Sequence, residues 1–224
     1  MTALPPHLAP TRTIDSDHPA VAALAAREAG AGSERERAVR LYYAVRDAIR
    51  YDPYAFRMGE ADLCASTTLA SGAAWCVPKA ILLAAACRAQ GIPARLGFAD
   101  VKNHLATERL LQLMDTDLFL WHGYVSLLLD GRWVKATPAF NIEMCRRFEV
   151  LPLEFDGTAD SLMHPFNARS QRHMEYVRDR GLFDDLPFAE MAADMWKAYP
   201  RLIALAGSRT GVGQFEADTI RREG

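Results

Sequence analysis

The chain has 224 residues, half of them apolar, with 26 basic against 28 acidic residues and a formal charge of −2. This length and apolar fraction are enough for a sizeable core without metal or disulfide staples. The balanced charge, the absence of a long apolar span and an N-terminus unlike a signal peptide argue for a cytoplasmic protein that binds neither nucleic acid nor membrane.

The first part of the chain is predicted to be an extended arm followed by helices. Ser33 can cap a helix with Glu36 at the capping-box position, and the apolar residues up to Tyr51 follow a helical spacing. Residues 54–72 mix small and polar residues without a clear period. We expect that segment to be long and irregular.

The most apolar stretch is AILLAAACRA at residues 80–89. Because it is apolar nearly all round, it is predicted to be a buried helix, with Pro78 in its first turn and Gly91 at its C-terminal end. A strand over 92–99 follows, and then a helical segment over 103–116. Residues 118–129 and 132–136 are predicted to form a hairpin around Asp130-Gly131.

The apolar pattern becomes discontinuous after Asn141. Helices are predicted over 168–180, with the charged run 175–180 as a solvated face, and over 188–199, where Pro200 follows. The chain is therefore divided into an arm and helix (1–32), a core (33–145), a helical extension packed on the core (146–204) and a loose tail (205–224).

The four cysteines show no paired spacing, so free thiols in a reducing compartment are expected. Cys76 directly precedes the buried helix, where free amide groups and the helix dipole favour a thiolate. Cys87 lies inside that helix and is predicted to be an inert packing residue. Two interpretations of Cys76 stay open, a nucleophile or a small core residue at a helix start.

His122 lies at the start of the first hairpin strand. A base on a rigid strand can be held against a nucleophile at a helix terminus. A single strand histidine is more often structural. The order of helix-borne cysteine, strand-borne histidine and hairpin is the more specific signal for a Cys-His enzyme.

Two runs carry a resemblance to a known family: WCVPKAILLAAACRAQGIPAR at 75–95 and WHGYVSLLLDGRWVKATPAFN at 121–141. Over about residues 35–141 the chain resembles the core of the transglutaminase-like superfamily. The resemblance implies an α+β, papain-like fold in which a cysteine-bearing helix packs on an antiparallel sheet. It also implies a Cys-His-Asp triad that forms a thioester with an acyl donor, with Cys76 at the position of the nucleophile and His122 at that of the base.

The third triad position departs from the family pattern, because Thr137 stands where aspartate is expected. A hydroxyl can accept a hydrogen bond from imidazole but supplies no charge to stabilise imidazolium. Asn141 is a second candidate, since papain-like enzymes use asparagine in this role. Thr137 is preferred by position, and a turn-stabilising role remains open for Asn141.

Four further residues are predicted to contact substrate. Trp75 can shape an acyl pocket or help to stabilise an oxyanion, although a core role is equally consistent. Trp121 adjoins the predicted base. Asn103 and His104 can form a substrate-facing wall, with a helix N-cap as the alternative for Asn103, and residues 104–120 are expected to form a mobile lid.

His164 and His173 could join His104 and His122 as metal ligands, but no pair has a zinc-ligand spacing. No metal and no cofactor are therefore predicted. The favoured function is a cysteine peptidase, amidase or acyl transferase acting on a peptide or small amide. The alternatives are a catalytically inactive binding domain, suggested by Thr137, and a metal-dependent hydrolase.

Overall fold

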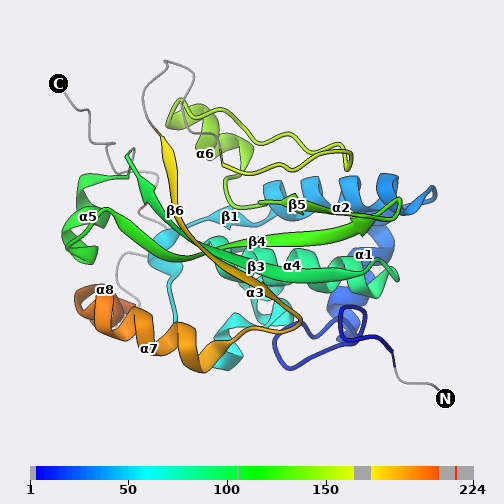
Figure 1. Ribbon diagram of the computed structural model, residues 1–224, viewed down its shortest axis with the longest axis horizontal. Helices are drawn as coiled ribbons and strands as arrows, with labels where there is room; N and C mark the ends of the chain where they lie inside the picture. The colour runs from blue at the N-terminus through cyan, green and yellow to red at the C-terminus, as the bar shows by residue number, and fades with distance from the viewer. Residues whose placement is uncertain (1–3, 105, 164–172, 207–214, 216–224) are drawn as a thin grey trace.

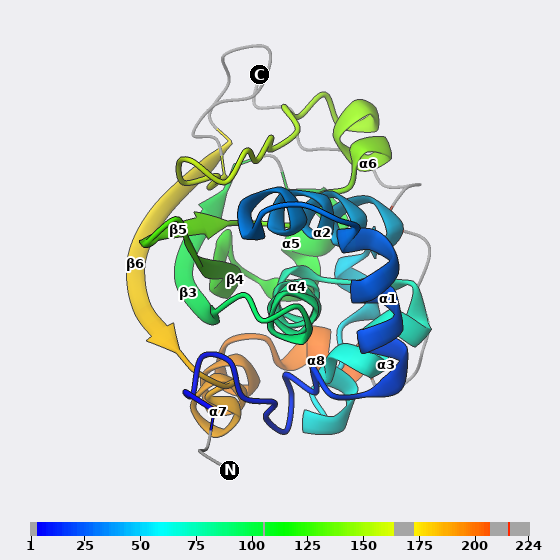
Figure 2. The same ribbon diagram turned by 90° about the vertical axis from the view of Figure 1, so that its right-hand side faces the viewer.

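The computed structural model describes residues 4–104, 106–163, 173–206 and 215. Its main sheet has four antiparallel strands in the order β5-β4-β3-β6. One helix, α4, packs along β4 and β3, and three others enclose it from the far side (Figure 2). The strands are β3 (Ala94–Asn103), β4 (Leu118–Leu129), β5 (Arg132–Ala136) and β6 (Met174–Phe183), and the helices are α1 (Pro19–Ala29), α2 (Glu34–Ala48), α3 (Ala65–Ser71) and α4 (Cys76–Ala89).

Helix α4 lies at the centre of the molecule, between the sheet and helices α1 to α3 (Figure 2). Every residue from Cys76 to Arg88 is buried, which is the all-round burial that its apolar sequence requires. The predicted α+β fold, with a cysteine-bearing helix buried on an antiparallel sheet, is confirmed.

The segment before α4 brings β1 (Arg50–Tyr51) beside β2 (Ala73–Ala74) as a short parallel pair. The predicted capping box of α2 is present, with Ser33 N–H donating to Glu36 at 2.8 Å. The prediction of an irregular segment over 54–72 is wrong in part, because α3 and the 3-10 helices Pro53–Ala55 and Glu60–Leu63 form there. These turns are too short to leave a visible period in the sequence.

The predicted hairpin is confirmed, with Leu129 opposite Arg132 across the turn. Asp130 and Gly131 have φ values of 49° and 78°, the left-handed pair that a two-residue hairpin turn needs. The predicted helix over 103–116 is shorter than expected, since α5 (Glu108–Met114) begins after Thr107, whose side chain caps it.

The prediction of a helix over 174–180 is wrong, and 164–172 lies outside the described residues. β6 pairs with β3 at the edge of the sheet, and its residues 175–179 are exposed. An edge strand that faces solvent carries charged residues, so its pattern resembles a solvated helix face. The extension after residue 146 thus adds a strand to the sheet as well as helices.

The other helices are α6 (Ile142–Arg147), α7 (Phe188–Ala198) and α8 (Pro200–Ala206), and α7 and α8 lie below β6 in the view of Figure 1. Most of the predicted tail at 205–224 lies outside the described residues. Phe215 is described and is buried against Tyr51, Tyr54 and Phe148. In the described part of the chain, no helix has the length and hydropathy of a membrane span.

Candidate active site

Cys76 is the first residue of α4 and opens onto a pocket, with 8% of its surface exposed. Burial raises the pKa of its thiol to about 11, while the backbone amides of Gly123, Val77 and Cys76 oppose that shift. The helix start therefore favours the thiolate as predicted, but desolvation of the sulfur is the larger effect. The thiol is neutral at neutral pH.

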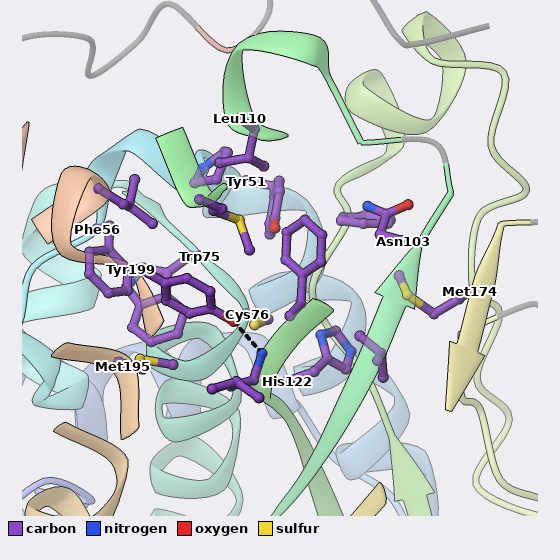
Figure 3. A pocket seen from close by; sticks show the side chains of 17 residues that line it. Tyr51, Phe56, Trp75, Cys76, Asn103, Leu110, His122, Met174, Met195 and Tyr199 are labelled. Carbon is purple, nitrogen blue, oxygen red and sulfur yellow. Dashed lines mark hydrogen bonds between the residues drawn. The ribbon is translucent and has the colours of Figure 1, made fainter. Parts of the chain in front are cut away.

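Gly123 allows β4 to lie directly on the first turn of α4. A Cβ atom at this glycine would come 3.0 Å from Cα of Val77, tighter than nine in ten Cβ contacts in proteins. This close approach places His122 and Cys76, which each adjoin one of the contacting residues, at the same pocket. Figure 3 shows both side chains reaching that pocket, one from α4 and the other from β4.

His122 is buried, and its environment keeps it neutral. Burial lowers the pKa of His122 to about 4, and the nearby charge of His173 contributes in the same direction. Within the described residues, Nε2 of His122 is buried and has no hydrogen-bond partner. At neutral pH the imidazole is unprotonated and can accept a proton, and its pKa near 4 makes it a weaker base than a free histidine.

Thr137 directly follows β5, and its backbone is held on both sides. Its N–H donates to Ser161 O at 3.0 Å, and its carbonyl accepts from Tyr42 Oη at 3.2 Å. Its Oγ1 is buried without a partner among the described residues. The β4–β5 register, with Val125 opposite Ala136, carries the chain at Thr137 toward the end of β4 that bears His122.

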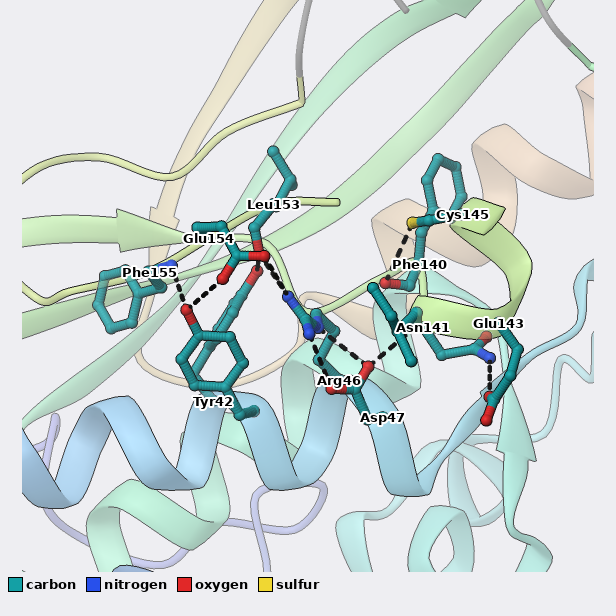
Figure 4. Close-up of polar contacts among 12 residues, drawn as sticks. Tyr42, Arg46, Asp47, Phe140, Asn141, Glu143, Cys145, Leu153, Glu154 and Phe155 are labelled. Atoms are coloured by element: carbon teal, nitrogen blue, oxygen red, sulfur yellow. Dashed lines mark hydrogen bonds and ion pairs between the residues drawn. The ribbon is translucent and has the colours of Figure 1, made fainter. Parts of the chain in front are cut away.

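Asn141 has a structural role in the fold. Its Oδ1 accepts from the N–H of Tyr51 at 2.9 Å, and its Nδ2 donates to Glu143 at 3.0 Å. Figure 4 shows the Asn141 amide directed toward Glu143, on the segment that α2 also holds through Asp47. The Asn141 side chain thus ties α6 to β1, which matches the alternative interpretation of this residue and not the orientation of His122.

The pocket has a volume of about 60 Å³ and is strongly apolar. None of the 17 described residues that line it is Asp, Glu, Lys or Arg. Trp75 and Asn103 line it as predicted, whereas His104 and Trp121 are not among its lining residues. The apolar part of the wall includes Phe56, Leu110, Met114, Phe119, Phe140 and Met195.

The four predicted substrate-binding residues differ in their contacts. Nε1 of Trp75 is a buried donor without a partner in the described part of the chain. His104 contacts Glu175 of β6 at 3.4 Å, and Trp121 packs behind the pocket on Phe98. Leu110 and Met114 of the expected lid do line the pocket, and the mobility of residues 104–120 remains a prediction.

The sequence interpretation missed Tyr51, Met174 and Tyr199, which line the same pocket. Tyr51 reaches it through the two-residue β1–β2 pair, and Met174 starts a strand that was predicted as a helix. No local pattern connects such distant segments, so only the fold could bring them together.

In the described residues, no group of three or more His, Cys, Asp or Glu could hold a metal, and His164 lies outside them.

The raised pKa of Cys76 predicts how its alkylation depends on pH. In the His122→Ala variant, where no imidazole can take the proton from the sulfur, the thiolate fraction, and with it the alkylation rate, should rise about tenfold per pH unit from pH 7 to 9, because the thiol titrates near pH 11. Mass spectrometry of the modified residue after timed exposure to iodoacetamide measures this rate. A plateau already reached at pH 7 would show a preformed thiolate and contradict the prediction.

The family model of the transglutaminase-like superfamily matches residues 22–138, just over half of the chain. No curated protein matches. Among solved structures, the crystal structure of a "Putative Cysteine Protease" from Cytophaga hutchinsonii is 18% identical, with a TM-score of 0.45, and the match covers 79% of this chain and 53% of that one. The chain thus spans about half the length of that protein. From the family match, this chain belongs to the transglutaminase-like superfamily.

Proposed function

We propose that the chain is a cysteine-dependent enzyme that cleaves or transfers acyl groups through a thioester on Cys76. Membership of the superfamily supports a cysteine-dependent enzyme at that coarse level. The observation that supports the finer proposal is the shared pocket of Cys76, at a helix start, and the neutral imidazole of His122. A nucleophile and a base that reach one cavity are the minimum for covalent acyl transfer.

His122 would act as a general base during the attack. Because burial disfavours both charged forms, the resting pair is a thiol and an imidazole, not a thiolate and an imidazolium. As the sulfur attacks the acyl carbon, its proton moves to His122. The thioester C–S bond forms, the amide C–N bond breaks, and the leaving amine takes that proton from the imidazolium.

The second half of the reaction would restore the thiol. Water, or an amine in the case of transfer, attacks the thioester and gives a proton to His122, which returns it to the sulfur as the C–S bond breaks. The negative charge on the carbonyl oxygen needs donors in each half. Trp75 Nε1 and the amides at the start of α4 are available for that role.

The pocket supports an uncharged, apolar acyl donor, as a peptide or small amide. A carboxylate or ammonium beside the scissile bond would lose its hydration without an opposite charge among the lining residues. With a volume of about 60 Å³, where one water needs about 10–15 Å³, the cavity has room for only a few substrate atoms. We therefore infer that a short apolar side chain enters and that the rest of the substrate stays outside.

A catalytically inactive binding domain is the second candidate. Thr137 supplies no charge to His122, and the buried thiol is less acidic than a free cysteine. The same apolar pocket would then hold a ligand without reacting. Formation of a thioester separates these two functions.

A series of p-nitrophenyl esters tests the proposed function. The acetyl and butyryl esters should acylate Cys76, whereas the succinyl and glycyl esters should react at least about tenfold more slowly, since their charges would be buried unpaired. Intact-protein mass spectrometry and p-nitrophenol release measure both. Cys76→Ala should abolish the adduct and Cys64→Ala, at the partly exposed thiol, should leave it unchanged. An adduct that persists in Cys76→Ala would contradict the assignment.

Acylation by the acetyl ester, p-nitrophenyl acetate, also tests which residue orients His122. Thr137→Val keeps the shape of the side chain and removes its hydroxyl, so acylation should fall by about tenfold to a hundredfold if Thr137 holds the imidazole, directly or through a buried water. Asn141→Ala should instead lower the free energy of unfolding by about 1–3 kcal/mol, because the Tyr51 N–H loses its partner. An unchanged rate in Thr137→Val, measured beside thermal unfolding of both variants, would remove Thr137 from the site.

A further inference from the structure

Strand β4 is irregular directly before His122. Ala99 lies opposite His122 but Val101 lies opposite Phe119, so Leu120 and Trp121 together face Asp100 in a β-bulge. Trp121 has a φ of 59°, a left-handed conformation that bulky side chains rarely adopt. A bulge changes the direction of the residues beside it, and here the next residue is His122.

Asp100 holds the backbone of this bulge. Its buried carboxylate accepts from the N–H of Trp121 at 3.1 Å and from Arg180 Nε at 2.5 Å. Arg180 reaches it because β6 has a bulge of its own, with Phe98 opposite Gly181 and Ala99 opposite Asp179. The extra residue in β6 is Arg180.

Arg180 and Asp194 hold the side chain of Trp121. The guanidinium carbon of Arg180 lies 4.3 Å from the centre of the indole ring, and its Nη1 is 2.6 Å from Asp194. Asp194, on α7, also accepts from Trp121 Nε1 at 2.9 Å. The Trp121 indole is thus held on one face by Arg180 and at its N–H by Asp194. The carboxylates of Asp100 and Asp194 both bond with the Arg180 guanidinium.

Tyr199 holds Leu120 of the bulge and Leu118 just before it. Its hydroxyl accepts from the N–H of Leu120 at 2.6 Å and donates to the carbonyl of Leu118 at 2.7 Å. Figure 3 shows the first of these bonds as a dashed line beside Cys76 and His122. Tyr199 thereby satisfies backbone groups of β4 and also lines the pocket.

We propose that these four side chains, Asp100, Arg180, Asp194 and Tyr199, form a β4 clamp that sets the position of the His122 imidazole. They are positioning residues, because each acts through the backbone or side chain of residues 118–121. Three of them lie beyond residue 138, where the match to the superfamily ends. The segment that carries β6 and α7 is therefore part of the active site and not an appendage, a role that rests on the proposed function of Cys76 and His122.

Arg180→Gln is the primary test, since Arg180 is not among the residues that line the pocket. The variant should move the imidazole NMR signals of His122, identified by their loss in His122→Ala, and lower acylation of Cys76 by p-nitrophenyl acetate at least about tenfold. Arg178→Gln, an exposed arginine on the same strand, is the matched control and should change neither. Asp194→Asn, at a side chain that is 44% exposed, is a milder variant if Arg180→Gln does not fold.

The background of His122→Ala separates positioning from general damage. If the clamp acts through His122, Arg180→Gln should not lower the residual acylation rate of His122→Ala any further. A further tenfold loss there, or unchanged His122 signals in both clamp variants, would overturn the proposal. If the wild-type protein forms no acyl adduct, the proposed function fails, and the His122 signals still decide whether the clamp positions the ring.

Discussion

The close packing of β4 on the first turn of α4 is the constraint on which the rest of the site depends. Gly123 has no side chain, so the strand reaches within contact of the Val77 backbone and brings a histidine to the head of a helix that starts with a cysteine. The same packing withdraws both groups from water. Desolvation then raises the pKa of Cys76 and lowers the pKa of His122, which leaves a neutral pair in an apolar pocket.

The neutral state of Cys76 and His122 determines when the proton of the thiol must move in the proposed reaction. A helix start was expected to stabilise a thiolate, and the amides around the sulfur do favour one, but their effect is smaller than that of burial. Because a neutral thiol is a weak nucleophile, the proposed function requires proton transfer to His122 during the attack. Under this proposal the geometry of the imidazole matters more than it would for a preformed thiolate, which is consistent with the four side chains that hold the strand segment before it.

Elements whose sequence pattern is compatible with only one structure could be predicted from the sequence. The apolar run of α4 can only be buried, and Asp130-Gly131 between two apolar strands can only be a tight hairpin, so the helix and the hairpin were predictable. The pairing of Cys76 with His122 rested on the order of these elements and on the family resemblance, and the two residues do line one pocket. β6 was assigned as a helix because an edge strand needs apolar residues on only part of its length, which leaves its charged run ambiguous. Asn141 was a plausible candidate by position, yet its amide is used by Tyr51 and Glu143.

The rest of the site depends on contacts between distant segments. Trp121 looks like an ordinary strand residue in the sequence, and neither Arg180 nor Asp194 carries a signal that it meets this tryptophan. Tyr199 was visible only as the last residue before Pro200, although it bonds with β4 about 80 positions earlier. Such contacts follow from the placement of β6 and α7 around the sheet, which no local period encodes.

The solvent isotope effect on acylation of Cys76 by p-nitrophenyl acetate tests the central claim most directly. If a neutral thiol gives its proton to His122 as the C–S bond forms, acylation should be slower in D₂O than in H₂O, and His122→Ala should remove that difference. An equal or faster rate in D₂O for the wild-type protein would show that the thiolate exists before the attack, and would contradict the neutral pair.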